Sequence, residues 1–399
     1  MYKLYCRLYQ FIFRIVTPFL PWRKPELLEG KGSLSRLPAL IKQQELNRIL
    51  IVTDKGISSL GLMDELLERL KLEEIEYFVY DRTVPNPTIT NIEEAFEVYQ
   101  FRNCLGIIAF GGGSPIDCAK GVAARIARPE KSIPQMKGVL KVRKRIPPLF
   151  AVPTTAGTGS ETTIAAVISN TETHEKYAIN DTALIPHVAV LDPLLTVKLP
   201  PHITSTTGMD ALTHAVEAYI GGSNTAETKR CSREAVQLIF ENLKEAYSNG
   251  TNIIARKNMQ KASYLAGVAF TRAYVGYVHA IAHTLGGFYS IPHGLANAVI
   301  LPYVLEYYGK SVYKPLAELA DLVGISNPTD GNKEKAIRFI EEIKKLNEGM
   351  NIPKKITGIV ESDITLMVER ALKEANPFYP VPKILLKQDI TNLYRIIKE

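Results

Sequence analysis

The chain has 399 residues, of which 46% are hydrophobic and 22% charged, and its formal net charge is +7. This composition is ordinary for a globular protein and excludes a disordered or fibrous class, while the length favours two domains. The densest basic run, 137–145, indicates a solvated loop or helix end rather than a nucleic-acid patch. The four cysteines form no C-x-x-C pair, which favours the reducing cytoplasm and argues against a structural zinc knot.

The first 22 residues are rich in Tyr, Phe, Ile and Leu and contain three basic side chains. The uncharged stretch 15–22 is too short to span a bilayer, and no cleavage site of small residues follows it, so we expect no signal peptide. Two interpretations stay open: an arm that packs on the body or on a neighbouring subunit, and an arm that lies in a membrane interface. We favour packing, and expect a helix over at least 5–16 that contacts the α/β domain or a neighbouring chain, without membrane attachment.

The next part of the chain alternates predicted strands with helices. Expected strands are 47–54, 75–81, 105–110, 148–152 and 188–191, and expected helices are 61–72, one opened by a capping box at Thr90–Glu93, and 114–127 with Ser114 as its N-cap. Strands that are apolar almost throughout and alternate with helices indicate a mostly parallel sheet covered on both faces.

Beyond about residue 200 the pattern becomes helical. Expected helices are 205–219, 226–247, 255–273, 279–288 and 333–346, and no segment there has the pattern of a strand. We therefore divide the chain near 199–201. Residues 1–200 form an α/β nucleotide-binding domain that carries the arm at 1–25, and residues 201–399 form an all-helical metal-binding domain.

Two short segments of the helical half carry four of the chain's seven histidines in apolar or small surroundings. Asp210 and His214 are four residues apart, so they share one face of a helix, and His279 and His283 have the same spacing. Imidazole and carboxylate groups that converge in an apolar setting are typical ligands of a divalent cation. These segments therefore predict a metal site.

Two loops of the α/β half have the composition of a nucleotide site. The turn Gly111–Ser114 joins a strand to a helix N-terminus, where backbone N–H groups and the helix dipole favour a pyrophosphate. A tight turn without a ligand is the alternative, since the G-x-G-x-x-G fingerprint is absent after the first strand. The loop 153–160 also follows a strand, and its hydroxyls and amides suit a phosphate or nicotinamide pocket, although a plain loop has the same composition.

Asp54 ends the first predicted strand. An acidic residue at this point accepts hydrogen bonds from the adenosine ribose hydroxyls, and its charge repels a 2′-phosphate. A simple turn or helix cap is an equal alternative on the sequence alone.

Seven segments together resemble the iron-containing (group III) alcohol dehydrogenases. They are VPNPT (84–88), FGGGSPIDCAK (110–120), VPTTAGTGSE (152–161), EKYAIND (175–181), VLDP (190–193), GMDALTHAVEAYI (208–220) and GYVHAIAHTLGGFYSIPHGLANAVILP (276–302). The resemblance runs from about Gly30 to the C-terminus; the arm and the basic run 137–145 depart from it. It implies the dehydroquinate synthase-like fold of this family, an α/β domain and a helical domain with the active site in the cleft between them.

The resemblance also implies the ligand set. Asp210, His214, His279 and His293 would bind one divalent metal, Fe²⁺ or Zn²⁺. His283 would stand beside the metal, close to nicotinamide and substrate, as a proton relay or as a packing residue. Spacing alone would have paired His279 with His283; only the resemblance selects His293.

The cofactor implied is NAD rather than NADP. The residues carried over by motif are Asp54 on the adenosine ribose, Asn86, Gly112, Gly113, Ser114 and Asp117 at the adenosine and pyrophosphate site, Thr154, Thr155 and Thr158 in the second loop, and Lys176 at the nicotinamide-side ribose.

The implied activity is the interconversion of an alcohol and an aldehyde or ketone by hydride transfer, on a small-molecule substrate and in a homodimer or higher homo-oligomer. A glycerol dehydrogenase is an alternative on the same architecture. A dehydroquinate synthase-like enzyme is another, although it needs a basic pocket and the segments around the metal are poor in Lys and Arg. A non-enzymatic membrane-surface or assembly protein is the remote alternative, motivated by the arm alone.

Overall fold

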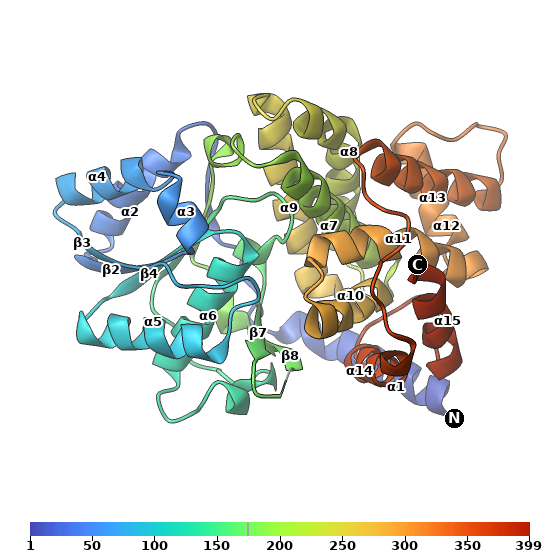
Figure 1. Ribbon diagram of the computed structural model, residues 1–399, viewed down its shortest axis with the longest axis horizontal. Coiled ribbons are helices and arrows are strands. Elements are labelled where there is room, and N and C mark those ends of the chain that lie inside the picture. Colours follow the sequence, from blue (N-terminus) through green and yellow to red (C-terminus); the bar gives the residue numbers. More distant parts are fainter. Residues whose placement is uncertain (174) are drawn as a thin grey trace. The chain divides into compact units, whose positions relative to one another are not determined.

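The computed structural model describes residues 1–173 and 175–399. The chain forms two compact units, one of Pro21–Lys198 and one of Met1–Leu20 together with Leu199–Glu399 (Figure 1). The division at 198–199 lies next to the predicted boundary. The arm, however, belongs by its contacts to the helical unit and not to the α/β unit.

The α/β unit is built on a six-stranded sheet in the order β1-β9-β6-β4-β2-β3, in which every neighbouring pair is parallel. The strands are β1 (Glu26–Glu29), β2 (Arg48–Val52), β3 (Glu76–Tyr80), β4 (Gly106–Gly111), β6 (Leu149–Pro153) and β9 (Val188–Leu191). The predicted parallel α/β fold is therefore confirmed. The short β1 was not predicted.

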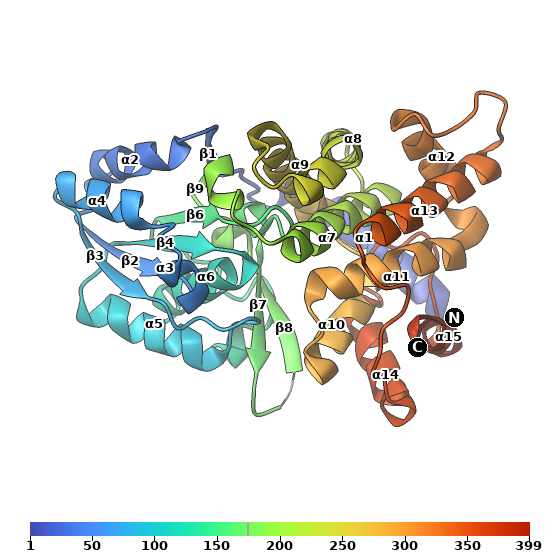
Figure 2. The same cartoon turned by 45° about the horizontal axis from the view of Figure 1, so that its top comes forward.

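Helices cover both faces of this sheet (Figure 2). They are α2 (Leu37–Gln43), α3 (Lys55–Ser59), α4 (Asp64–Leu72), α5 (Ile89–Phe101) and α6 (Gly113–Ala127). Successive residues of β4 serve two cores: Ile107 packs with the core of α5 and α6, and Ile108 with the core of α2 and α4. This explains the continuous apolar runs of the strands, since neither face of the sheet meets water.

Two helix starts differ from the sequence prediction. Helix α5 begins at Ile89, and its capping box is formed by Thr88 and Asn91 instead of Thr90 and Glu93. The extended backbone of Thr88 places its hydroxyl to accept from the Asn91 N–H, as an N-cap does. The N-cap of α6 is Gly112, so Ser114 lies inside the first turn.

A second, three-stranded sheet in the order β5-β8-β7 was not predicted. Its strands are β5 (Gly138–Val139), β7 (Ala165–Asn170) and β8 (Glu175–Asn180), of which β7 and β8 are antiparallel. The basic run 137–145 passes through β5 into a loop. The Asp181 carboxylate holds this loop by accepting from the N–H groups of Val142 and Arg143.

The second unit is helical, as predicted. Its main helices are α7 (Pro201–Ile220), α8 (Ala226–Ser248), α9 (Ile253–Ala273), α10 (Tyr277–Tyr289), α11 (His293–Tyr308), α12 (Tyr313–Leu322), α13 (Asn332–Gly349), α14 (Ile364–Ala375) and α15 (Lys387–Ile397). Helices α11, α12, α14 and α15 were not predicted. Helix α11 is apolar on most of its circumference and contains Pro302, so it shows no helical periodicity.

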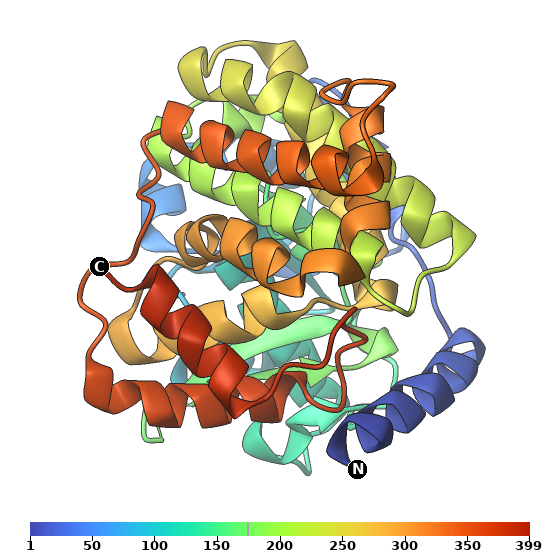
Figure 3. The same cartoon turned by 90° about the vertical axis from the view of Figure 1, so that its right-hand side faces the viewer.

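The arm forms helix α1 (Tyr2–Val16), as the sequence predicted, at the edge of the helical unit (Figure 3). The arm was expected to contact the α/β domain or a neighbouring chain; by its contacts α1 belongs to the helical unit, and a contact with a neighbouring chain stays a prediction. Arg7 donates to the carbonyls of Val381 and Pro382, and Gln10 donates to the carbonyl of Tyr379. In the described residues, no helix is both long and apolar enough to cross a membrane.

Candidate active site

Three helices bring four potential metal ligands together. Asp210 and His214 lie one turn apart on α7, His279 is in the first turn of α10, and His293 opens α11. One ligand atom from each lies within 4.8 Å of those of the other three. The structure thus assembles the same set that the resemblance implied.

Glycine at position 294 allows this close approach. A Cβ atom on Gly294 would lie 2.4 Å from the carbonyl oxygen of Thr206 on α7, so only glycine lets the start of α11 rest on the α7 backbone. The neighbouring His293 is thereby carried to Asp210, with its Nε2 3.6 Å from the carboxylate Oδ1.

The fully buried amide of Asn297 stands among these groups. Its Nδ2 lies 2.6 Å from Oδ1 of Asp210, 3.2 Å from Nε2 of His279 and 3.1 Å from Nε2 of His293. Three electron-pair donors thus converge on one point, while the buried Oδ1 of Asn297 has no hydrogen-bond partner among the described residues. One carboxylate and three imidazoles in a dry setting fit a divalent cation such as Fe²⁺ or Zn²⁺.

Glu217 lies behind this cluster on α7. Its Oε2 is 2.6 Å from Nδ1 of His279, and its carboxylate also accepts from the N–H groups of Gly276 and Val278. Since Nδ1 is engaged in this way, the ring directs Nε2 toward the other ligands. Sequence reasoning missed Glu217, although it is seven residues after Asp210 and shares its helix face.

His283 lies beside the cluster and is not part of the mutually close set. Its Nδ1 is 2.7 Å from Oε1 of Glu374, which also accepts from the Tyr379 hydroxyl. Its ring stacks on that of His293 with 5.1 Å between centroids. Its side chain is 20% exposed, so the ring is next to the cluster and is also reached by water.

In the α/β unit, the predicted cofactor residues gather at one edge of the sheet. The chain passes from β2 outward to β3 and then returns to β4 on the other side of β2. Such a reversal opens a crevice at the carboxyl ends of the two strands, where ligands of α/β sheets bind. Asp54 follows β2 at this edge, and Gly112 and Gly113 follow β4.

The second loop packs against the glycine turn. A Cβ atom on Gly113 would lie 2.8 Å from the Thr158 methyl group, and one on Gly112 would lie 3.4 Å from Thr155. The N–H of Thr154 donates to the carbonyl of Gly111. The two small-residue loops therefore pack together, with Thr155 and Thr158 against the glycines, at a helix N-terminus whose backbone N–H groups favour a phosphate.

Asn86, Ser114 and Lys176 form a second group in this unit. The Ser114 hydroxyl accepts from the N–H of Asn86, and the ammonium of Lys176 donates to Oδ1 of Asn86 at 2.8 Å. The structure thus joins three predicted cofactor residues that are far apart in the sequence.

Asp117 and Asp54 both bind protein groups. Asp117 accepts from the Ser160 hydroxyl at 2.6 Å and from the N–H of Val167, so it fixes the second loop. Burial raises the pKa of Asp117.

Oδ1 of Asp54 accepts from the N–H of Ile57 and caps α3. The helix-cap interpretation of Asp54 is therefore correct, and its contact with a ribose stays a prediction.

Lys120 and Glu161 are buried near Asp117, and sequence reasoning did not single them out. The Lys120 ammonium donates to the Thr163 hydroxyl and carbonyl and to the carbonyl of Ala165. Burial lowers the pKa of Lys120 to about 8 and raises that of Glu161 to about 7. The hydrogen bonds of Lys120 hold Thr163 and Ala165, which follow the loop that packs on the glycine turn.

A parallel α/β unit with a glycine-rich edge and a helical unit with a carboxylate–imidazole cluster define the class of metal- and nucleotide-dependent oxidoreductases. Residues 25–193 match the family model of iron-containing alcohol dehydrogenases, and residues 204–397 match that of the C-terminal part of the same family.

Individual relatives agree. The chain is 40% identical to the 1,3-propanediol dehydrogenase of Klebsiella pneumoniae, over 87% of this chain and 90% of that protein. It is 40% identical to alcohol dehydrogenase 4 of Saccharomyces cerevisiae, again over 87% and 90%. The solved alcohol dehydrogenase from Oenococcus oeni superposes with a TM-score of 0.91 at 37% identity, covering 95% of this chain and 100% of that one.

The chain belongs to the iron-containing alcohol dehydrogenase family. It is accordingly an enzyme that interconverts an alcohol and an aldehyde or ketone, and dependence on a divalent metal and on NAD(P) is typical of the family. The predicted fold class and reaction class are confirmed.

Proposed function

We propose that Asp210, His214, His279 and His293 hold one divalent cation at which a small alcohol or its aldehyde binds. The observation that carries this proposal is the convergence of the ligand atoms within 4.8 Å of one another, with the Asn297 amide at their centre. Asp210, His279 and His293 direct a carboxylate oxygen and two ring nitrogens toward the same amide nitrogen of Asn297. Carboxylate and imidazole groups that converge in this way suit a divalent cation.

A cation held there would supply polarisation of the substrate oxygen, and a bound nicotinamide would supply the donor or acceptor of the hydride on the substrate carbon. The chain contributes positions and proton transfer. Glu217 keeps the proton of His279 on Nδ1, so Nε2 keeps its lone pair for the cation. Glu374 holds Nδ1 of His283 in the same way, which leaves the Nε2 of His283 to take up or return the hydroxyl proton.

We infer that the nucleotide is NAD rather than NADP. The glycine turn at the carboxyl end of β4 offers backbone N–H groups to a pyrophosphate. Asp54 stands at the carboxyl end of the neighbouring β2, where its negative charge would disfavour a 2′-phosphate. Lys176, which we propose for the nicotinamide-side ribose, donates at 2.8 Å to Asn86, which we propose for the adenosine and pyrophosphate site.

The substrate class follows from relatives. One is named 1,3-propanediol dehydrogenase and another, 32% identical, lactaldehyde reductase. We propose small alcohols, diols and their aldehydes as substrates. The four cysteines are all free and buried, which supports work in a reducing cytoplasm.

A reconstitution experiment tests the proposal. Purified protein is stripped with a chelator, and Fe²⁺ under anaerobic conditions or Zn²⁺ is returned. NADH and NADPH oxidation are then followed with propanal, 3-hydroxypropanal and lactaldehyde. We expect no turnover without metal, recovery with one of the two ions, and preference for NADH. Full turnover in the stripped protein would overturn the metal role, and a preference for NADPH would overturn the cofactor assignment.

A further inference from the structure

Helix α1 turns its apolar side outward. Leu4, Leu8, Phe11 and Ile15 follow one another at spacings of four and three, so they line one helix face. Their exposures are 74%, 57%, 61% and 53%. Ile12, at 52%, widens the same face, and we call these five residues the outer face. Elsewhere, large exposed apolar side chains are mostly scattered, which is the normal condition of a protein surface.

The opposite side of α1 is fixed to the protein. Cys6 and Gln10 are buried, and they stand two positions away from Leu4 and Leu8, on the far side of the helix. The Phe13 ring packs on Phe378 with 5.1 Å between centroids. Together with the hydrogen bonds of Arg7 and Gln10, these contacts keep the helix folded. The outer face is therefore ready to bind without a cost for ordering the helix.

The charges of the arm favour an anionic partner. Residues 1–24 contain five basic and no acidic side chains: Lys3, Arg7, Arg14, Arg23 and Lys24. Lys3, Arg7 and Arg14 have helical spacing and form a row along one border of the outer face, and Arg7 is also bonded to two backbone carbonyls. An anionic lipid surface matches both the apolar face and this row. The arm of a second copy would match the apolar face but offers the row no acidic side chain.

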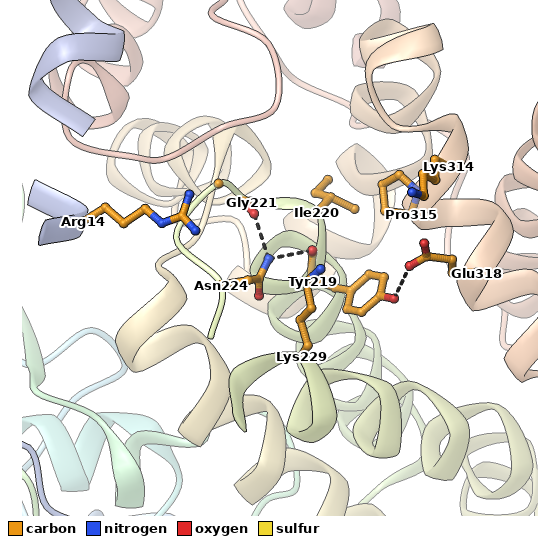
Figure 4. A pocket seen from close by; sticks show the side chains of 10 residues that line it. Arg14, Tyr219, Ile220, Gly221, Asn224, Lys229, Lys314, Pro315 and Glu318 are labelled. Carbon is orange, nitrogen blue, oxygen red and sulfur yellow. Dashed lines mark hydrogen bonds between the residues drawn. The ribbon is translucent and has the colours of Figure 1, made fainter. Parts of the chain in front are cut away.

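A pocket at the end of this row suits an anionic headgroup. It has a volume of about 370 Å³ and is lined by Arg14 of α1, Lys229 of α8 and Lys314 of α12 (Figure 4). Glu318 is its acidic residue, and its carboxylate accepts from the Tyr219 hydroxyl at 2.5 Å. Three cationic residues and one acidic residue line the pocket, so its lining has a net positive charge that fits a phosphate group.

We propose that the outer face and this pocket dock the enzyme on an anionic phospholipid surface. The apolar side chains enter the interface, and a headgroup phosphate binds against Arg14, Lys229 and Lys314. The helix lies in the interface plane, since no described helix is long and apolar enough to span a bilayer. The sequence alone favoured packing of the arm on the body or on a neighbouring subunit; in the structure one side of α1 packs and its outer face is exposed.

Vesicle binding by the full-length protein is the test. Sedimentation with vesicles of phosphatidylglycerol and phosphatidylethanolamine should carry the protein down, and pure phosphatidylcholine vesicles should carry much less. The double variant Leu8→Asp with Phe11→Asp should lose at least tenfold in partition coefficient. Ile254→Asp is the matched control, because Ile254 is 72% exposed on α9 of the same unit and lies outside the outer face; it should bind as the unmodified protein does.

The charge contribution is measured separately. Lys3→Gln and Arg14→Gln should each lower the partition coefficient about fivefold, the weight of one basic residue at an anionic surface. Lys229→Gln should do the same if the pocket holds the headgroup. Inorganic phosphate at the phosphorus concentration of the vesicles should not release the protein; release would assign the pocket to free phosphate and overturn the headgroup role.

Two readouts separate docking from misfolding and self-association. All variants should retain metal and aldehyde reduction, because none of the changed residues belongs to the proposed catalytic machinery. Trp22 is the single tryptophan and follows α1 closely, so its emission should shift to the blue with anionic vesicles. If the unmodified protein does not bind vesicles, and Leu8→Asp with Phe11→Asp lowers its mass in light scattering, a second copy covers the face and the proposal is wrong.

Discussion

Oε2 of Glu217 lies 2.6 Å from Nδ1 of His279, and the same carboxylate accepts two backbone N–H groups at the start of α10. This contact couples a buried charge on α7 to the orientation of a proposed metal ligand on α10. Residue 276, next to this carboxylate, has to be glycine, because a Cβ atom on Gly276 would lie 2.6 Å from Oε1 of Glu217. The ring of His279 is thus fixed by a neighbour that is not itself in the ligand set.

Glu217→Gln is expected to weaken metal binding 10- to 100-fold, the usual effect of losing a carboxylate behind a ligating imidazole. Three N–H donors converge on this carboxylate, and an amide offers only one acceptor oxygen to them. Competition with a chelator measures the affinity directly. Glu227→Gln is a control, since Glu227 pairs with Arg272 at 2.7 Å and is absent from the ligand cluster. Equal affinities of the Glu217 variant and the unmodified protein would contradict the positioning role.

In the proposed site His293 is a metal ligand and His283 is not. His279→Ala and His293→Ala should each abolish metal retention, whereas His283→Ala should retain metal and lose about 10²- to 10⁴-fold in turnover, the range of general acid–base catalysis. Metal content by mass spectrometry and circular dichroism are measured together, so that unfolding is recognised. Metal loss in His283→Ala with retention in His293→Ala would reverse the assignment.

The sequence pointed to the proposed metal ligands, but it did not reveal the carboxylates that bind the histidine rings. Asp210, His214 and His279 stand out because polar groups are rare in apolar helical segments. Glu374 binds His283 across 91 residues of chain, and no local pattern reports such a contact. Glu217 is the exception, since its spacing from Asp210 places both on one face of α7.

In the fold, too, some elements could be predicted from the sequence and others could not. The strands of the parallel sheet are short apolar runs between turns, so the sequence predicts them well. The strand pair β7 and β8 was missed because burial alternates along β7 while the sequence does not: the half-buried Val167 lies between the buried Ala166 and Ile168 and is itself apolar. The sequence did not indicate the surface on which α1 packs, because its anchors are backbone carbonyls of 379–382, which carry no signal in the sequence.

Acid should destabilise the α/β unit through His187. Its Nδ1 accepts from the N–H of Leu149, and burial together with the nearby Arg23 charge lowers its pKa to about 4. In the unfolded chain the pKa of His187 is near 6.5. Between pH 6.5 and pH 4 His187 is therefore protonated in the unfolded chain and neutral in the folded one, so the free energy of unfolding falls as the pH drops through this range.

The loss between pH 7 and pH 5 should be about 2 kcal/mol. Denaturant titrations at the two pH values, followed by the emission of Trp22, measure it. His187→Gln keeps an acceptor for Leu149 and does not titrate, so it should lose less stability over the same interval. If both proteins lose the same amount, another group is responsible for the acid sensitivity.

Cofactor preference should depend on the charge of Asp54, and the structure shows how to remove that charge alone. Asp54 caps α3 through the N–H of Ile57, so Asp54→Gly would lose the cap together with the charge. Asp54→Ser keeps a capping oxygen. We expect the native enzyme to prefer NADH, and Asp54→Ser to raise kcat/KM for NADPH at least tenfold with little change in Tm.

Asp81→Ser is the matched control, because Asp81 accepts from the Ser58 hydroxyl beside the same helix and is not predicted to contact the ribose. If the two variants gain equally with NADPH, the effect belongs to the general field of this edge and not to a contact of Asp54 with the nucleotide.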